Sequence, residues 1–176
     1  MSAQLQYRPT ASRQGREPVS QNVSIVDHPG VLAPAPILYG AAFLVGVLLH
    51  GVFPKPILPL DIAPLAAFGL LGCGAALAVW SRRTLEGAGT NVHPSLPATT
   101  LVVTGPFGFS RNPMYVARTL LYLGLGSMVN ALGILVALVP LLLVMHYGVI
   151  TREECYLEAK FGEAYRQYRT RVRRWL

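Results

Sequence analysis

Charged residues are scarce in this sequence. Only 13% of its 176 residues are charged, whereas 52% are hydrophobic. Soluble globular domains have about a quarter of their residues charged. The composition therefore excludes an ordinary soluble domain and indicates a membrane protein, and the length is that of one domain.

Residues typical of metal sites and redox frameworks are also few. The two cysteines, Cys73 and Cys155, lie in different contexts and suggest neither a disulfide framework nor metal-ligand spacing. His93 and His146 have no ligand partners nearby in the sequence, so we expect no metal site. No Ser-His-Asp arrangement can be read, and the Gly-x-x-Gly at 105–108 lacks the βαβ unit of a dinucleotide fingerprint.

Acidic residues are outnumbered by basic ones, which gives a net charge of +7 and a pI near 9.9. In a soluble protein this balance would raise nucleic acid as a partner. Here the arginines flank apolar stretches, and the sequence contains no motif for binding DNA or RNA. We therefore expect membrane lipids as partners and no nucleic acid.

Long apolar stretches dominate what is present. No Asp, Glu, Lys or Arg occurs between Asp27 and Lys55, or between Arg118 and Arg152. At about 1.5 Å per helical residue, such stretches are long enough to cross a bilayer, although the third is short. We predict an all-α polytopic membrane protein with about four transmembrane helices, at residues 35–53, 62–80, 113–129 and 131–150.

The ends of the chain differ from these spans. Residues 1–30 are polar and predict a flexible N-terminal arm, while residues 31–176 form the membrane domain. In the tail, residues 151–176, Tyr165, Tyr168 and Val172 recur at helical spacing beside a basic face. This pattern predicts an amphipathic cytoplasmic helix that lies on the membrane surface.

One asparagine and several small residues indicate which helices are connected by a tight turn and where helices pack closely. Asn130 alone separates the third and fourth spans, so we expect these two helices to form an antiparallel hairpin. The second span carries small residues spaced for close helix contact, namely Gly69, Gly72, Gly74 and Ala78.

The arginines predict the orientation. With four spans, one side of the membrane receives Arg8, Arg13, Arg16, Arg82, Arg83, Arg111 and the C-terminal cluster, and only Lys55 lies in the opposite loop. By the positive-inside rule both termini are cytoplasmic. The loop at 101–115 and the Glu153-Glu154 pair then lie on the same side and close together.

That loop, LVVTGPFGFSRNPMY at 101–115, is a candidate site. Asn112 is a good N-cap residue and Pro113 suits the first position of a helix. A helix N-terminus beside Arg111 can hold a polar ligand. An ordinary capped loop between two membrane helices explains the same residues about equally well.

Two carboxylates face this loop in the predicted topology. Glu153 and Glu154 are consecutive, so they point about 100° apart on a helix and cannot both face one target. We expect one to meet a cationic or hydroxyl-rich ligand and the other to face solvent or an arginine. Ordinary surface charge is the alternative.

Two ionisable residues lie inside the predicted spans. Arg118 is one turn inside the third span, on the face of Tyr115 and Tyr122, and we favour a side chain that reaches the lipid headgroups. His146 lies late in the fourth span, where a hydrogen-bonded packing role is the common one. A functional role remains the alternative for both.

These blocks together resemble a known family. The loop at 101–115, followed after a helical hairpin by EECYLEAKFGEAYRQYRTRVRRW, is similar to the isoprenylcysteine carboxyl methyltransferase and phospholipid methyltransferase superfamily. The resemblance covers roughly residues 84–175. It implies an integral membrane enzyme that uses S-adenosylmethionine without a Rossmann domain and methylates a lipophilic acceptor, either an isoprenylcysteine-like carboxylate or a phospholipid amine.

The resemblance also implies site residues. It assigns Arg111 and Glu154 to catalytic or orienting roles. It assigns cofactor binding to Thr99, Thr100, Leu101, Val102, Phe107, Asn112, Pro113, Met114, Tyr115 and Glu153.

The sequence departs from the prenylcysteine enzymes of higher organisms at several motif positions. Those enzymes tend to have His where this chain has Thr99, Tyr at Phe107 and His at Asn112. They also carry a basic, substrate-facing residue where this chain has Val149. The last difference weakens the case for a prenylcysteine carboxylate, and Asn-Pro-Met-Tyr is closer to the phospholipid N-methyltransferase version.

Two other functions are compatible with the sequence. Membrane reductases of the sterol type share a related C-terminal architecture and use NADPH, but they are usually longer and have more spans. A non-catalytic membrane subunit that retains the fold is the other alternative. The identity of the acceptor and the oligomeric state stay open.

Overall fold

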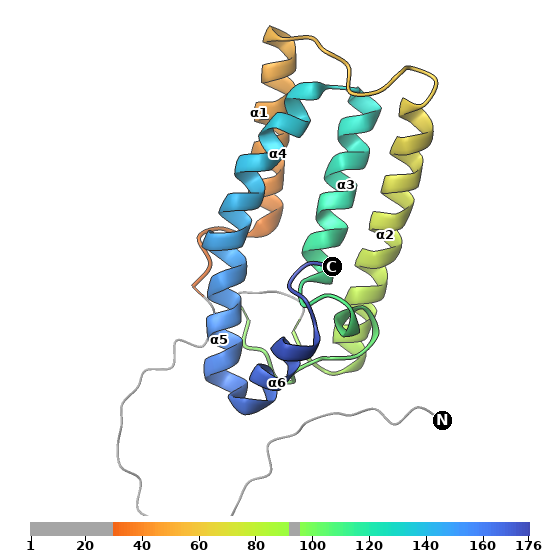
Figure 1. Cartoon of the computed structure of the whole chain (residues 1–176). Coiled ribbons are helices and arrows are strands. Elements are labelled where there is room, and N and C mark those ends of the chain that lie inside the picture. Colours follow the sequence, from red (N-terminus) through yellow and green to blue (C-terminus); the bar gives the residue numbers. More distant parts are fainter. Residues whose placement is uncertain (1–29, 92–95) are drawn as a thin grey trace, which may run out of the picture.

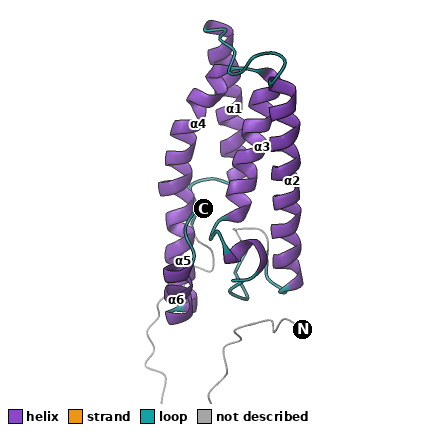
Figure 2. Cartoon of the chain, turned by 45° about the vertical axis from the view of Figure 1, so that its right-hand side comes forward, coloured by secondary structure: helices purple, strands orange, loops and turns teal. Residues whose placement is uncertain are grey.

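The computed structural model describes residues 30–91 and 96–176. The expected N-terminal arm apart from Gly30, including its three arginines, and His93 lie outside the described residues. In the described part every regular element is a helix and no strand occurs (Figure 2). The elements are α1 (Ala35–Val52), α2 (Ala63–Gly87), η1 (Gly105–Gly108), α3 (Pro113–Val129), α4 (Leu132–Val144), the π-helical η2 (Met145–Ile150), α5 (Thr151–Phe161) and α6 (Glu163–Arg171).

The long helices run alongside one another as a bundle (Figure 1). Three helical stretches are long and apolar enough to cross a membrane, namely Ala35–Val52, Ala63–Gly87 and Leu132–Phe161. α3 has 17 residues, about 26 Å at 1.5 Å per residue, and packs along α2. The predicted all-α membrane architecture is confirmed, with α3 as a short fourth member of the bundle.

The helices pair differently from the expected hairpin. α3 and α4 follow each other and run in opposite directions, but α3 packs chiefly on α2 and α4 packs chiefly on α1. The predicted antiparallel hairpin is therefore present at the α3–α4 turn, but the two helices do not pack along their length. Away from their connected ends they separate (Figure 1).

Glycines explain this pairing. A Cβ on Gly74 would lie 3.0 Å from the Ala117 carbonyl oxygen, and one on Gly124 would lie 2.8 Å from Leu71 Cγ, so α2 and α3 approach closely at both points. In the same way, a Cβ on Gly46 would lie 2.6 Å from Ile134 Cα and would push α1 away from α4. The contact predicted for Gly74 is confirmed.

Not every small residue of the second span serves helix packing. A Cβ added to Gly69 or Gly72 would meet no atom within 4 Å. The prediction that these two glycines permit close helix contact is therefore wrong, because they lie on a face of α2 that no other helix covers.

Asn130 holds the turn between α3 and α4. It adopts the left-handed conformation with φ of 52°, which asparagine tolerates better than most residues. Its Oδ1 accepts hydrogen bonds of 2.9 Å from both Ile57 N and Leu58 N, and its Nδ2 donates to the Leu58 carbonyl at 2.8 Å. One side chain thus fixes the α1–α2 connection to this end of the bundle.

The last long helix extends past the membrane. Leu132–Phe161 is a 30-residue helical stretch, about 45 Å long, whereas the hydrocarbon core is about 30 Å thick. Its charged end, α5, therefore lies beyond the apolar bundle.

The tail takes a different form from the one predicted. Gly162, with φ of +54°, ends α5, and α6 follows as a second helix. Residues 172–176 then return between the α4–α5 stretch and α3 (Figures 1 and 2). The prediction of one surface-lying helix is wrong in this respect, because the positive φ that glycine allows breaks the helix and redirects the chain.

Candidate functional site

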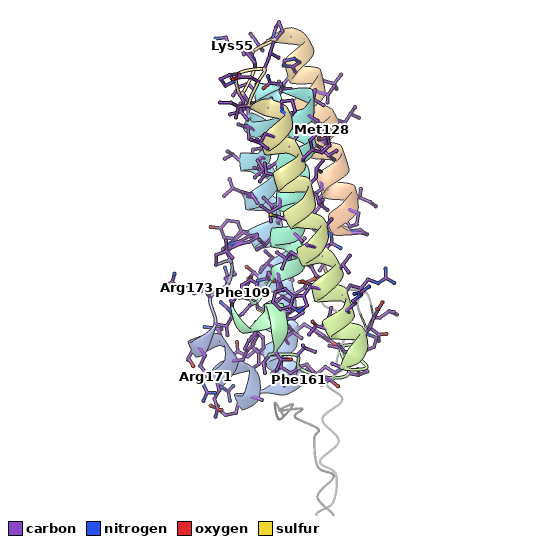
Figure 3. All side chains as sticks on the ribbon, turned by 90° about the vertical axis from the view of Figure 1, so that its right-hand side faces the viewer. Lys55, Phe109, Met128, Phe161, Arg171 and Arg173 are labelled. Atoms are coloured by element: carbon purple, nitrogen blue, oxygen red, sulfur yellow. The ribbon has the colours of Figure 1, made fainter. Side chains whose placement is uncertain are left out.

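A cavity lies at the charged end of the bundle, where the α2–α3 connection meets α5 and α6. This is the end that carries Phe109, Phe161, Arg171 and Arg173, opposite Lys55 (Figure 3). Every site residue predicted from the sequence except Thr99 lines this cavity, namely Thr100, Leu101, Val102, Phe107, Arg111, Asn112, Pro113, Met114, Tyr115, Glu153 and Glu154.

Thr99 lies outside the cavity and is exposed. Its hydroxyl donates to the Gly89 carbonyl at 2.8 Å, and its backbone N–H donates to Thr90 Oγ1 at 3.1 Å. Thr99 therefore anchors the segment that enters the site.

Glu153 is held toward the cavity by α3. The Tyr115 hydroxyl donates to Glu153 Oε1 at 2.5 Å, across 38 residues of sequence. Pro113 starts α3 as predicted, and Tyr115 follows two residues later. A charge-assisted hydrogen bond from a tyrosine that the resemblance placed in the site thus links the loop to Glu153.

Glu154 is buried and meets two arginines. Its Oε1 lies 3.0 Å from Arg111 Nη1, while Arg174 donates to Oε1 at 3.0 Å and to Oε2 at 2.6 Å. The expectation that one carboxylate of the pair faces an arginine is confirmed, and Glu154 is that carboxylate.

Arg111 reaches Glu154 as an ion pair with poor hydrogen-bond geometry. Its side chain is 10% exposed, and neither Nε nor Nη1 makes a hydrogen bond within the described structure. A buried guanidinium with free N–H groups at a cavity wall can donate hydrogen bonds to an oxyanion or a carbonyl oxygen of a ligand.

Asn112 departs from its predicted role. It occupies the N-cap position of α3, but its side chain makes no cap hydrogen bond. Instead its Nδ2 donates to the Arg174 carbonyl at 3.0 Å, and its backbone N–H donates to Ser110 Oγ at 3.1 Å. The expectation of a side-chain cap is therefore wrong, because the returning C-terminal segment takes the side chain.

The C-terminal segment holds the site together through hydrogen bonds to the loop and to η2. The Arg111 backbone N–H donates to the Arg173 carbonyl at 2.9 Å, and Arg174 Nη1 lies 2.8 Å from His146 Nε2 in η2. The hydrogen bonds to Glu154 raise the pKa of Arg174 above its usual range. His146 is thus hydrogen-bonded, as expected for a packed histidine.

Two tyrosines of α6 close the outer wall. Tyr165 and Tyr168 are buried and pack with Leu101, and the Tyr168 hydroxyl donates to the Phe107 carbonyl at 2.7 Å. Burial, followed by the negative charge of Glu154, raises the pKa of Tyr165 to about 12, so its hydroxyl stays protonated at neutral pH. These rings are the apolar-aromatic face of the tail, and they pack inward on the loop.

Arg118 also belongs to this cavity. Its guanidinium lies over the Tyr115 ring, 5.4 Å from the centroid, and its side chain lines the same wall as Glu153. We expected this side chain to reach the lipid headgroups, but in the structure it lines the cavity instead.

Sequence reasoning missed part of the site. The α6 tyrosines had a signal in their spacing, and Arg118 had one as a charge inside a span. Arg174 had none, because only the return of the chain at 172–176 brings it to Glu154. The other missed lining residues come from the end of α2, the α2–α3 connection and α5, without a local signal, namely Leu85, Thr90, Asn91, Leu96, Ala98, Tyr156 and Leu157.

Comparison with curated proteins finds two partial relatives. A protein of Haemophilus influenzae described as uncharacterized is 42% identical over 67 residues, which are 36% of this chain and all of that protein. The cobalt-zinc-cadmium resistance protein CzcN of Cupriavidus metallidurans is 32% identical over 101 residues, 56% of this chain but only 43% of CzcN. No solved structure matches.

A family comparison covers the site itself. Residues 62–164 match the phospholipid methyltransferase family, which belongs to the isoprenylcysteine carboxyl methyltransferase-like superfamily. The matched region runs from the start of α2 to α6 and contains most of the cavity wall. Together with the apolar helical bundle, this match identifies the chain as a member of the phospholipid methyltransferase family and a membrane methyltransferase of the phospholipid/isoprenylcysteine type.

Proposed function

We propose that this chain transfers a methyl group from S-adenosylmethionine to a lipophilic acceptor at the cytoplasmic face of a membrane. The observation that carries the proposal is the cavity lined by Tyr115, Glu153 and the loop from Thr100 to Pro113, inside the region that matches the methyltransferase family.

The residues of the cavity fit such a cofactor. Glu153 offers a carboxylate to a cationic or hydroxyl-bearing group, and the unused donors of Arg111 suit a carboxylate. Leu101, Met114 and Leu157 supply apolar wall for an aromatic base. A ligand that combines positive, negative and aromatic groups would therefore find a matching surface.

Methyl transfer makes modest chemical demands on the protein. When bound, S-adenosylmethionine supplies an electrophilic methyl group on a sulfonium. Displacement at this carbon needs alignment and exclusion of water more than a strong acid or base. Tyr115 holds Glu153, and Arg174 and Arg111 hold Glu154, so the chain provides a wall whose carboxylates are fixed before a ligand arrives.

The acceptor is a lipid or a lipophilic small molecule that enters from the bilayer. A carboxylate acceptor attacks without losing a proton, whereas an amine must release one. The Asn-Pro-Met-Tyr sequence at 112–115 favours a phospholipid amine over a prenylcysteine carboxylate.

The proposed orientation places both termini in the cytoplasm. Lys55 lies at one end of the bundle, and Arg171 and Arg173 lie at the other (Figure 3), an asymmetry that supports a cytoplasmic site. In intact cells, a membrane-impermeant thiol reagent should label a cysteine placed at residue 57 but not one at residue 170, in a variant without native cysteines. The reverse labelling would contradict the orientation.

Ligand binding to the purified full chain tests the assignment against its alternatives. We expect S-adenosylmethionine, and not NADPH, to raise the melting temperature and to give a binding isotherm by calorimetry. Stabilisation by NADPH alone would favour a reductase of the sterol type. No response to either compound would favour a non-catalytic membrane subunit.

A further inference from the structure

Arg118 is a charged group that the proposed methyl transfer leaves without a role. It lies five residues beyond Pro113, about 7.5 Å along α3 into the bundle. Its guanidinium stacks over Tyr115 and lines the cavity. Among the described residues it makes no hydrogen bond and no ion pair within 4 Å, and its charge interacts electrostatically with the Glu153 carboxylate. An ionisable side chain inside a span is costly unless a partner neutralises it.

The other charges of the site already have partners. Glu154 is shared by Arg111 and Arg174, and Glu153 accepts the Tyr115 hydroxyl. With Arg118 included, three arginines face two glutamates, so the site carries one surplus positive charge. S-adenosylmethionine bears a sulfonium, an ammonium and a carboxylate, so its binding adds positive charge and does not offset the surplus.

We infer that Arg118 binds an oxyanion of the acceptor lipid and thereby selects acceptors that carry a phosphate or carboxylate near the methylated atom. This inference rests on the proposed function. Guanidinium binds phosphates and carboxylates through two parallel hydrogen bonds, which fix orientation as well as charge. The Tyr115 ring lies on one side of the guanidinium, 5.4 Å from ring centroid to Cζ, and its negative face favours the positive charge.

The position of Arg118 suits an acceptor more than the cofactor. Arg111 lies at the loop side of α3, before its first residue, whereas Arg118 lies about one and a half turns inside the helix. A lipid that enters laterally from the bilayer would reach the cavity from the bundle side, where Arg118 lies, whereas a water-soluble cofactor would reach it from the loop side. Arg118 is therefore assigned as a specificity-determining residue, with Arg111 left to the cofactor side.

The test measures lipid binding directly and does not require the natural acceptor. Full-length protein in detergent is mixed with S-adenosylhomocysteine and equal amounts of oleate, phosphatidic acid and diolein, and native mass spectrometry counts the bound lipids. We expect wild-type protein to prefer at least one anionic lipid over diolein. Preference for oleate identifies carboxylate recognition, and preference for phosphatidic acid identifies phosphate recognition.

The Arg118→Gln variant should lose this preference by roughly tenfold, as expected for a hydrogen-bonded charge pair. Arg171→Gln removes an equal charge from the exposed end of α6 and should leave the preference intact. No preference in wild-type protein, or the same preference in Arg118→Gln, would overturn the inference. Equal losses in both variants would also overturn it, because they would indicate general attraction to a basic surface.

Cofactor binding separates this inference from the proposed function. Calorimetry with S-adenosylmethionine should show that Arg118→Gln protein loses far less affinity for the cofactor than for the anionic lipid, although Arg118 lies beside the Glu153 charge. A loss of cofactor affinity as large as the loss of lipid preference would make Arg118 a cofactor residue and overturn the inference. If wild-type protein ignores S-adenosylmethionine but keeps an Arg118-dependent lipid preference, the proposed function fails and the lipid site stands.

Discussion

A substitution at Glu153 can test cofactor binding separately from the stability of the fold. Its carboxylate takes one hydrogen bond from Tyr115 and faces the cavity, while Glu154 bears the structural ion pairs. Glu153→Gln keeps the shape of the side chain and removes its charge. We expect S-adenosylmethionine affinity to fall by about 1.5–3 kcal/mol, as for a lost hydrogen bond to a charged group.

Calorimetry on purified protein measures this change, and Glu163→Gln is the matched control. Glu163 is an exposed carboxylate at the start of α6, and it lies outside the cavity. Unchanged affinity in a folded Glu153→Gln variant would remove Glu153 from the cofactor site.

Substitutions at Asn112 distinguish a helix cap from a contact with the C-terminal segment. If it were only a cap, Asn112→Asp would be nearly silent, since both residues cap well. In the structure its amide donates to the Arg174 carbonyl, so aspartate would place a buried carboxylate against a carbonyl oxygen. We expect Asn112→Asp to destabilise the protein by about 1–3 kcal/mol and Asn112→Ser to cost less. Equal thermal stability of wild-type and Asn112→Asp protein would contradict this contact.

At the residue scale, local rules predicted two positions. Pro113 starts α3 because the first helical position needs no backbone N–H donor. Asn130 turns the chain between α3 and α4, at the opposite end of the bundle from the site, in the left-handed conformation that asparagine tolerates. The side chain of Asn112 and the position of Thr99 could not be predicted in this way. Their partners, Arg174 and Gly89, reach them only through the fold.

The C-terminal segment at 172–176 is the element that holds the site together. Through Arg174 it binds Glu154, His146 and the Asn112 amide, and through the Arg173 carbonyl it binds the loop. We expect Arg174→Gln to lower both thermal stability and S-adenosylmethionine affinity, because it leaves buried Glu154 with only Arg111. Arg174→Lys should restore part of the stability, since it keeps the charge but not the two-pronged contact.

Thermal unfolding and calorimetry on these two variants measure the effect. Arg173→Gln is the control, because Arg173 contributes its backbone carbonyl to the loop and its exposed side chain makes no hydrogen bond or ion pair in the described structure. If Arg174→Gln matches Arg173→Gln in both measurements, the segment does not support the site.

The sequence predicted where the helices lie along the chain better than it predicted which helices pack together. Apolar length located α1, α2 and α4, and a proline located the start of α3. The partner of each helix depended on which glycine faces which neighbour. Gly124 meets Leu71 and so joins α3 to α2, whereas the sequence indicated only that α3 and α4 share a short turn. The break at Gly162 was likewise hidden within a pattern that reads as one helix.

At the scale of the whole molecule, one end of the apolar bundle carries the charged site. The Leu132–Phe161 helix is longer than the hydrocarbon core and brings Glu153 to the membrane boundary, where the α2–α3 loop and the C-terminal segment meet it. This arrangement allows a polar cofactor to arrive from water and a lipid to arrive from the bilayer. The family match over residues 62–164 gives the chemistry expected there.

Transfer of a labelled methyl group to lipid is the measurement that tests the central claim most directly. Membranes containing wild-type protein, Glu153→Gln protein or no added protein are incubated with methyl-deuterated S-adenosylmethionine, and their lipid extracts are compared by mass spectrometry. The account predicts at least one lipid that gains the labelled methyl group only with wild-type protein, with the product reduced about tenfold or more in Glu153→Gln membranes. The same labelled lipids in all three samples, or none in the wild-type sample, would contradict it.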